Sequence, residues 1–210
     1  MIKAIIADDH AIVRRGLSQI LADEPDMAAP GEVRDAQELM DSVLEQDWDV
    51  VILDIAMPGK SGFDILKDLK SMKPDLPVLI LSIHPEEQYA IRTLKAGAAG
   101  YINKESAPTE LVKAIRKAVA GGKYVSPALA EKLAFELDGD FVRSPHGRLS
   151  DREYQVLCLI ASGKRVKEIA EELSLSDKTV STYRSRILEK MKMETNAELT
   201  YYAIKNRLVE

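Results

Sequence analysis

The 210-residue chain contains one cysteine and one tryptophan, and aromatic residues make up only 5% of it. A single cysteine excludes an internal disulfide framework, so the composition fits a reducing compartment. No apolar run approaches the ~20 residues that a membrane-spanning helix needs, and the N-terminus lacks the basic-then-apolar pattern of a signal peptide. With 46% hydrophobic and 30% charged residues, the chain is typical of a soluble globular protein, and we expect a cytoplasmic location and no membrane partner.

The chain also lacks the excess of positive charge that bulk electrostatic binding to nucleic acid requires, since its formal net charge is −5. This total hides an asymmetry. Residues 1–148 carry 18 basic and 24 acidic side chains, whereas residues 149–210 carry 11 basic and 10 acidic ones. Within residues 176–192 there are five basic side chains and two acidic ones. The C-terminal part can therefore present one local basic surface that binds nucleic acid.

Strand and helix patterns alternate over the first 121 residues. Short apolar runs predict five strands, at residues 2–7, 27–33, 50–54, 78–81 and 99–102. Helical patterns fill the gaps, near residues 11–22, 36–46, 62–72, 86–96 and 108–120. Because Pro30 cannot donate to a strand ladder, the weak strand that contains it is expected at a sheet edge. The alternation predicts an α/β fold, a doubly wound five-stranded parallel sheet with helices on both faces.

The pattern changes after Gly121-Gly122. Turn-rich sequence over residues 122–148 predicts an interdomain linker with one helical segment, at 127–137. From residue 149 the strand signals vanish, and Ser150 with Glu153 has the spacing of a capping box. Helices are expected at about 151–161, 166–173, 177–192 and 196–206. Two short helices joined by three residues indicate a helix-turn-helix, so residues 149–210 should form a small all-α domain.

Polar side chains stand where the predicted strands end. Asp8 and Asp9 follow the first strand, Asp54 closes the third, Ser82 follows the fourth, and Lys104 comes after the fifth. In an open α/β sheet these carboxyl ends meet at the ligand-binding edge. Three carboxylates there form a hard-oxygen cluster suited to Mg²⁺. An Asp54 that is open to solvent could act as a nucleophile toward a phosphoryl donor, with Ser82 and Lys104 hydrogen-bonding the transferred oxygens.

Residues 1–121 resemble the receiver domain of bacterial two-component response regulators. The matching residues are Asp8, Asp9, Asp54, Met57, Pro58, Gly62, Ser82, Tyr101 and Lys104. The resemblance implies that Asp54 accepts a phosphoryl group from a sensor histidine kinase. It also implies a flavodoxin-like fold, a switch pair of Ser82 and Tyr101, and Mg²⁺ held by Asp8, Asp9, Asp54 and the carbonyl of Ala56.

Residues 149–210 resemble the helix-turn-helix of the NarL/FixJ (LuxR-type) regulators. The match runs through residues 149–153, Val156-Leu157, Ile160-Ala161, Gly163, 167–170, Leu173, Ser176, Thr179-Val180 and Lys190. The resemblance implies a transcription regulator that is switched by phosphorylation of Asp54, binds double-stranded DNA and forms a homodimer when phosphorylated.

The third helix of this domain is expected to read DNA. On a 100° wheel its buried side is marked by Val180, Tyr183, Ile187 and Met191. Three hydroxyl residues lie on the other side, free to enter the major groove: Ser181, Thr182 and Ser185. The residues that flank them and could contact phosphates are Lys178, Thr179, Arg186 and Lys190.

Three other functions fit parts of the sequence. A phosphatase or phosphotransferase that turns over through an aspartyl-phosphate often uses Asp-x-Asp, and Asp54-Ile55-Ala56 lacks the second acid. The chain is therefore not expected to be a turnover enzyme, and autodephosphorylation is compatible with this expectation. A flavin-binding module would need a Ser/Thr-rich phosphate loop after the first strand, which is absent. A regulator that binds DNA without phosphorylation would not need the intact acidic site.

Overall fold

The computed structural model describes the chain except for residues 58–59, 85, 128, 132–143, 207 and 210. It divides into two compact units, residues 1–127 and 128–210, which are described separately. Among the described helices, none combines the length and the apolar character that crossing a bilayer demands.

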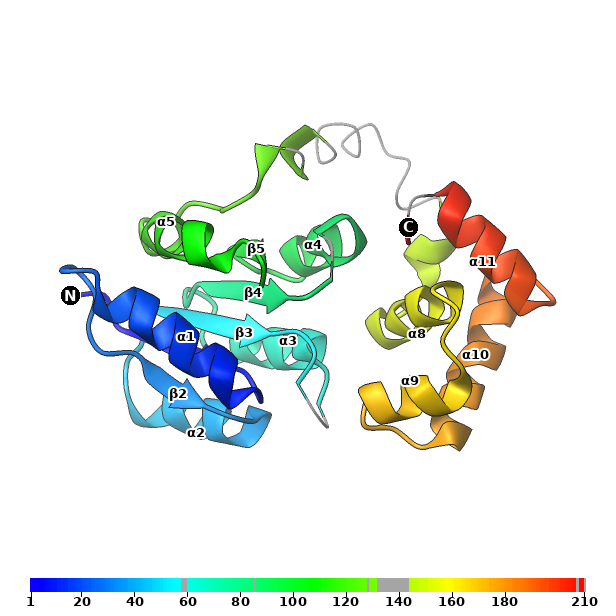
Figure 1. Ribbon diagram of the computed structural model, residues 1–210, viewed down its shortest axis with the longest axis horizontal. Coiled ribbons are helices and arrows are strands. Elements are labelled where there is room, and N and C mark those ends of the chain that lie inside the picture. The colour runs from blue at the N-terminus through cyan, green and yellow to red at the C-terminus, as the bar shows by residue number, and fades with distance from the viewer. Residues whose placement is uncertain (58–59, 85, 128, 132–143, 207, 210) are drawn as a thin grey trace. The chain divides into compact units, whose positions relative to one another are not determined.

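The first unit is a five-stranded parallel sheet with strand order β2-β1-β3-β4-β5 (Figure 1). The strands are β1 (Ala4–Ala7), β2 (Gly31–Val33), β3 (Val50–Asp54), β4 (Val78–Ser82) and β5 (Gly100–Asn103). This order confirms the predicted doubly wound sheet. The weak strand lies at the edge, as its proline requires, and it is shorter than expected: ahead of Gly31 only an isolated bridge between Ile2 and Met27 extends the pairing.

Helices cover both faces of this sheet (Figure 1). They are α1 (Ala11–Ala22), α2 (Ala36–Glu45), α3 (Gly62–Met72), α4 (Glu86–Lys95) and α5 (Ala107–Val119). Alternate strand residues such as Ile6 and Ile52 share one buried core with Leu17 of α1 and Ile115 of α5. Their strand neighbours are buried as well, and because successive side chains point to opposite faces, the sheet is apolar on both sides.

A glycine sets the path of the chain just after β3. At Gly62, the first residue of α3, an added Cβ would lie 2.5 Å from Cα of Ile55 and 2.8 Å from its carbonyl oxygen. The preceding residue, Ser61, caps the helix by accepting the Phe63 N–H at 3.3 Å. The start of α3 therefore packs directly against the loop that leaves Asp54.

The second unit is helical throughout its described residues. It contains a short 3₁₀ helix, η1 (Pro145–Arg148), and α8 (Asp151–Ala161), α9 (Val166–Glu172), α10 (Asp177–Met191) and α11 (Asn196–Lys205). The predicted capping box is confirmed, because Ser150 Oγ accepts the Glu153 N–H at 3.3 Å and the Ser150 N–H donates to Glu153 Oε2 at 2.7 Å. Helix α8 packs against both α10 and α11, and Leu157, Ile187 and Leu199 of these three helices are fully buried.

The expected linker is anchored at both ends. Tyr124 is buried and donates its N–H to the Ala99 carbonyl at 2.7 Å, so the chain still belongs to the sheet of the first unit there. In the second unit His146 is buried, and its Nδ1 lies 2.7 Å from the Tyr202 hydroxyl. Of the helical segment expected at 127–137, Pro127 and residues 129–131 are helical and the remainder lies outside the described residues.

Candidate functional site

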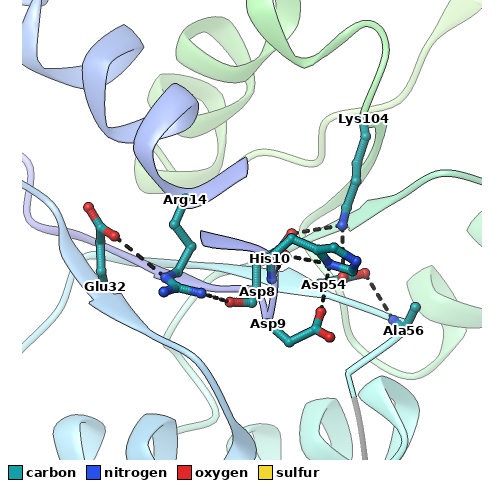
Figure 2. A network of polar contacts seen from close by, with 8 residues as sticks. All are labelled: Asp8, Asp9, His10, Arg14, Glu32, Asp54, Ala56 and Lys104. Carbon is teal, nitrogen blue, oxygen red and sulfur yellow. Dashed lines mark hydrogen bonds and ion pairs between the residues drawn. The ribbon is translucent and has the colours of Figure 1, made fainter. Parts of the chain in front are cut away.

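Four of the predicted strand-end residues converge: Asp8, Asp9, Asp54 and Lys104 (Figure 2). Asp8 follows β1, Asp54 ends the neighbouring β3, and Lys104 follows β5. The Lys104 Nζ lies 2.7 Å from Asp8 Oδ2 and 2.8 Å from Asp54 Oδ2. One ammonium group thus bridges the two carboxylates that parallel pairing of β1 with β3 places side by side.

The condition that Asp54 be open to solvent is not met in this structure. The Asp54 side chain is 0% exposed. Its Oδ1 accepts the Ala56 N–H at 2.9 Å, and its Oδ2 accepts a hydrogen bond from Lys104 Nζ. The reason is that Lys104 closes over the carboxylate from a strand that is distant in sequence.

Burial and charge oppose each other at this pair. Burial raises the pKa of Asp54 above its usual value, with a further upward push from Asp8, while Lys104 and the Ala56 N–H act to lower it. Burial acts to lower the pKa of Lys104, but Asp54 and Asp8 outweigh it and raise that pKa. The lysine therefore stays protonated, and the two carboxylates depend on it for their charge compensation.

The same cluster has the donor set of a divalent metal site. Asp8, Asp9, His10 and Asp54 each offer one ligand atom, and these four atoms lie within 4.8 Å of one another. Asp8 Oδ2 is buried and is paired with the Lys104 ammonium at 2.7 Å. Clustered carboxylate oxygens of this kind are suited to a divalent ion. His10 was not predicted as a site residue from the sequence. Its position directly after Asp8-Asp9 was the only indication of a role at this site.

The two predicted switch residues meet at one residue of the loop after β4. Ser82 Oγ accepts the His84 N–H at 3.0 Å. Tyr101 is buried, and its hydroxyl donates to the His84 carbonyl at 2.9 Å, where Asn103 Nδ2 also donates at 3.3 Å. Two side chains of β5, Tyr101 and Asn103, therefore hold the loop that follows Ser82.

Helix α10 presents the residues expected to meet DNA. It begins after Ser176, which caps it by accepting the Thr179 N–H at 3.1 Å. Val180, Ile187 and Met191 are buried, as the wheel predicted, and Tyr183 is half-buried. Exposed on the outer side are Lys178, Ser181, Thr182, Ser185 and Arg186, with Thr179 half-buried. A shallow depression lies among Lys178, Thr179, Thr182, Tyr183 and Arg186.

Lys190 and the hydroxyl residues already have partners within this unit. The Lys190 Nζ lies 2.6 Å from Oε2 of the buried Glu153 on α8. Thr182 donates its hydroxyl to the Lys178 carbonyl at 2.9 Å, and Ser185 to the Ser181 carbonyl at 3.1 Å. These hydroxyl oxygens are left as acceptors on the outer face.

Comparison with known proteins matches both halves of the chain. Residues 4–116 match the response regulator receiver domain, and residues 147–203 match the bacterial regulatory proteins of the luxR family. Response regulator GacA of Pseudomonas aeruginosa is 36% identical over 211 residues, which span 100% of this chain and 99% of that protein. Response regulator UvrY of Escherichia coli K12 is 34% identical over 209 residues, 99% of this chain and 96% of that protein.

A solved structure covers nearly the same length. RcsB from Salmonella enterica serovar Typhimurium, bound to promoter rprA in the presence of phosphomimetic BeF₃⁻, aligns with a TM-score of 0.67 and 32% identity over 96% of this chain and 97% of that one. Both resemblances expected from the sequence are confirmed. The chain belongs to the two-component response regulators that join a receiver domain to a LuxR-type helix-turn-helix, and it is a DNA-binding transcription regulator of that family.

Proposed function

We propose that phosphorylation of Asp54 by a sensor histidine kinase controls DNA binding by this regulator in the cytoplasm. In this proposal residues 1–121 are the receiver, residues 122–148 connect the domains, and residues 149–210 bind DNA. The observation that carries it is the pair of fully buried carboxylates, Asp8 and Asp54, bridged by Lys104 at the carboxyl edge of the sheet.

The chain's own residues would supply a carboxylate nucleophile and groups that hold the transferred phosphoryl oxygens. An Asp54 oxygen forms a bond to phosphorus while the P–N bond to the phosphohistidine breaks, and the electron pair of that bond leaves with the histidine nitrogen. Lys104 and the Ser82 hydroxyl then hydrogen-bond the phosphoryl oxygens. The chain acts as the acceptor in this reaction, not as an enzyme that turns over.

Asp8, Asp9, Asp54 and the Ala56 carbonyl would hold Mg²⁺. When bound, the ion offsets the repulsion between carboxylate and phosphate and polarises the phosphoryl group. One observation favours the site: Asp8, Asp9 and Asp54 each offer a ligand atom, and these atoms lie within 4.8 Å of one another. The carbonyl of Ala56 is a suitable extra ligand because the Ala56 N–H already fixes that loop on Asp54.

The switch that we propose uses Ser82 and Tyr101. A phosphoryl group on Asp54 would draw the Ser82 hydroxyl, whose oxygen now accepts the His84 N–H. The His84 loop would then shift, and the Tyr101 hydroxyl that donates to the same residue would follow. Phosphorylation of Asp54 would in this way move the loop at His84 and the Tyr101 side chain, and so change the surface of the receiver.

The output that we propose is a homodimer on a two-fold DNA site. Each subunit would insert the outer face of α10, with Ser181, Thr182 and Ser185 at the bases. Lys178, Thr179, Arg186 and Lys190 would contact phosphates. Lys190 would have to loosen its pairing with Glu153 to do so. Tyr201 and Ile204 of α11 are exposed apolar side chains that could pair the two DNA-binding domains.

The test measures oligomeric state by light scattering and binding to a randomised DNA pool, with and without Mg²⁺ plus beryllofluoride. We expect a Mg²⁺-dependent shift to a dimer with tighter specific DNA binding. The shift should be absent in Asp54→Ala and present in Asp64→Ala, which removes an exposed acid of α3. Equal DNA binding in every condition would mean that the receiver does not control this output.

A further inference from the structure

We propose that the imidazole of His10 is an additional ligand of the receiver's metal site, so that this site favours ions with a higher affinity for nitrogen, such as Co²⁺, relative to Mg²⁺. The inference rests on the proposed metal site at Asp8, Asp9 and Asp54, and it extends the class of ion that this site would bind.

The spacing of the donor atoms matches a coordination sphere. His10 Nδ1 lies 2.8 Å from Asp9 Oδ1 and 3.2 Å from Asp8 Oδ1 (Figure 2). Neighbouring ligands of an octahedral ion with bonds of ~2.1 Å stand about 3.0 Å apart, and opposite ones about 4.2 Å apart. The two distances from Nδ1 are those of adjacent corners. The ligand atoms of Asp8, Asp9, His10 and Asp54 all lie within 4.8 Å of one another, a limit above the octahedral span, so the set would draw together on binding an ion.

The backbone around His10 is fixed without help from its ring. The His10 N–H donates to Asp8 Oδ1 at 2.8 Å, and Arg14 donates to the Asp8 carbonyl at 2.6 Å (Figure 2). His10 is the N-cap residue of α1, but its side chain makes no capping hydrogen bond. Ser, Thr, Asp or Asn would cap this helix better. The His10 side chain therefore does not cap the helix, and its ring turns toward Asp8 and Asp9.

If the ring only made hydrogen bonds to the two carboxylates, its removal would have the opposite effect on the affinity for divalent ions. In that case the ring competes with any cation for Asp8 and Asp9, and removing it tightens the binding of every divalent ion. As a ligand, the ring favours ions according to their affinity for nitrogen. Imidazole binds Co²⁺ and Ni²⁺ better than Mn²⁺, whereas Mg²⁺ prefers oxygen. With its side chain 60% exposed, the ring is free to make the small adjustment that ligation needs.

The test compares the full-length protein with His10→Ala and with His10→Asn, which keeps a hydrogen-bond donor at the same place. Calorimetric titrations with Mg²⁺, Mn²⁺ and Co²⁺ give the affinities. Electron spin-echo spectroscopy of the Mn²⁺-loaded protein detects ¹⁴N that is bonded directly to the ion. We expect a nitrogen modulation that both variants lose. We also expect Co²⁺ affinity to fall about tenfold or more, on the scale of a lost metal-site interaction, while Mg²⁺ affinity changes less than about twofold.

Retained Mg²⁺ binding by the variants shows that they are folded. Absence of nitrogen modulation in the native protein overturns the inference and leaves the Mg²⁺ site intact. Modulation that persists in His10→Ala, or Co²⁺ affinity that rises in it, overturns the inference as well. Failure of the native protein to bind any of the three ions would overturn the proposed metal site itself.

Discussion

Replacing Lys104 by methionine removes the ammonium group that bridges two buried carboxylates. The Asp8 and Asp54 side chains are 0% exposed and that of Lys104 is 13% exposed. Methionine keeps a flexible side chain of similar length but carries no charge. Because the ammonium lies within 2.8 Å of both acids, the substitution leaves two neighbouring negative charges without compensation.

The expected cost follows from general measurements on buried ion pairs. Removing one partner of such a pair costs about 3–5 kcal/mol, because the other charge stays buried. Two features argue for the lower end of this range. The variant no longer has to desolvate the lysine, and each acid keeps one backbone N–H, from His10 on Asp8 and from Ala56 on Asp54. We therefore expect a loss of about 3 kcal/mol in the free energy of unfolding of the metal-free receiver near neutral pH.

The loss should depend on pH in a defined direction. Without Lys104, burial and the charge of Asp8 both act to raise the pKa of Asp54. A carboxyl whose pKa is raised on folding favours the folded state when it is protonated. That contribution is complete below the unfolded value, near 3.8, and is lost as pH rises through the raised pKa of the folded state. The difference between the native protein and Lys104→Met should be small at low pH and should grow as pH rises.

Urea unfolding from about pH 4.5 to about pH 8, followed by tryptophan fluorescence, measures this difference. Trp48 is the only tryptophan of the chain and lies in the first unit, so the signal reports the receiver alone. With a urea dependence of about 1–3 kcal/mol per molar, the midpoint should fall by roughly 1–3 M at the upper pH. Lys113→Met, at an exposed position of α5, is the control. A midpoint shift that is equal at every pH would indicate lost packing and refute the electrostatic explanation.

Gly62→Ala should destabilise the receiver by about 1–3 kcal/mol, because the new Cβ would lie 2.5 Å from a backbone atom of the preceding loop. Gly16→Ala lies in α1 with nothing within 4 Å of its Cβ, so it should stabilise the receiver by about 0.5–1 kcal/mol. Urea unfolding measures both changes. Lys190→Ala should destabilise the second unit by about 1 kcal/mol, since it leaves the buried Glu153 without its cation. Arg186→Ala should leave stability within about 0.5 kcal/mol and reduce the slope of log affinity for DNA against log salt by about 0.9; an unchanged slope would exclude a phosphate contact.

Much of the acidic site can be predicted from the sequence, because the end of an apolar run marks both the end of a strand and the edge of the sheet where that end lies. Asp54 ends an apolar run, and in a parallel sheet the end of such a run is also the edge where the other strands end. Periodicity therefore places Asp8, Asp54 and Ser82 together before any distance is known. The capping box at Ser150 is equally local, since both of its hydrogen bonds join residues three positions apart.

The features that were not predicted depend on pairs that are distant in sequence. Asp54 is covered because Lys104 reaches it from fifty positions away, and Lys190 finds Glu153 from thirty-seven positions away. Local patterns describe which face a side chain occupies, but they do not determine its partner across the fold. His10 was overlooked for a different reason, because its significance lies in the direction of its ring and not in its position on a helix or strand.

Because Lys104 bridges carboxylates that could also hold a metal ion, the stability lost in Lys104→Met can be compared with the stability gained from ion binding. Both are free energies of unfolding in kcal/mol. A divalent ion held by Asp8 and Asp54 would supply the positive charge that Lys104 supplies in the metal-free protein, which would free the ammonium for phosphoryl oxygens. An ion at a hundredfold excess over its dissociation constant stabilises the folded state by about 2.7 kcal/mol. This gain nearly equals the loss of about 3 kcal/mol expected for Lys104→Met. Saturating Mg²⁺ should therefore restore most of the stability of that variant, whereas a variant that Mg²⁺ does not stabilise would place the ion away from these carboxylates.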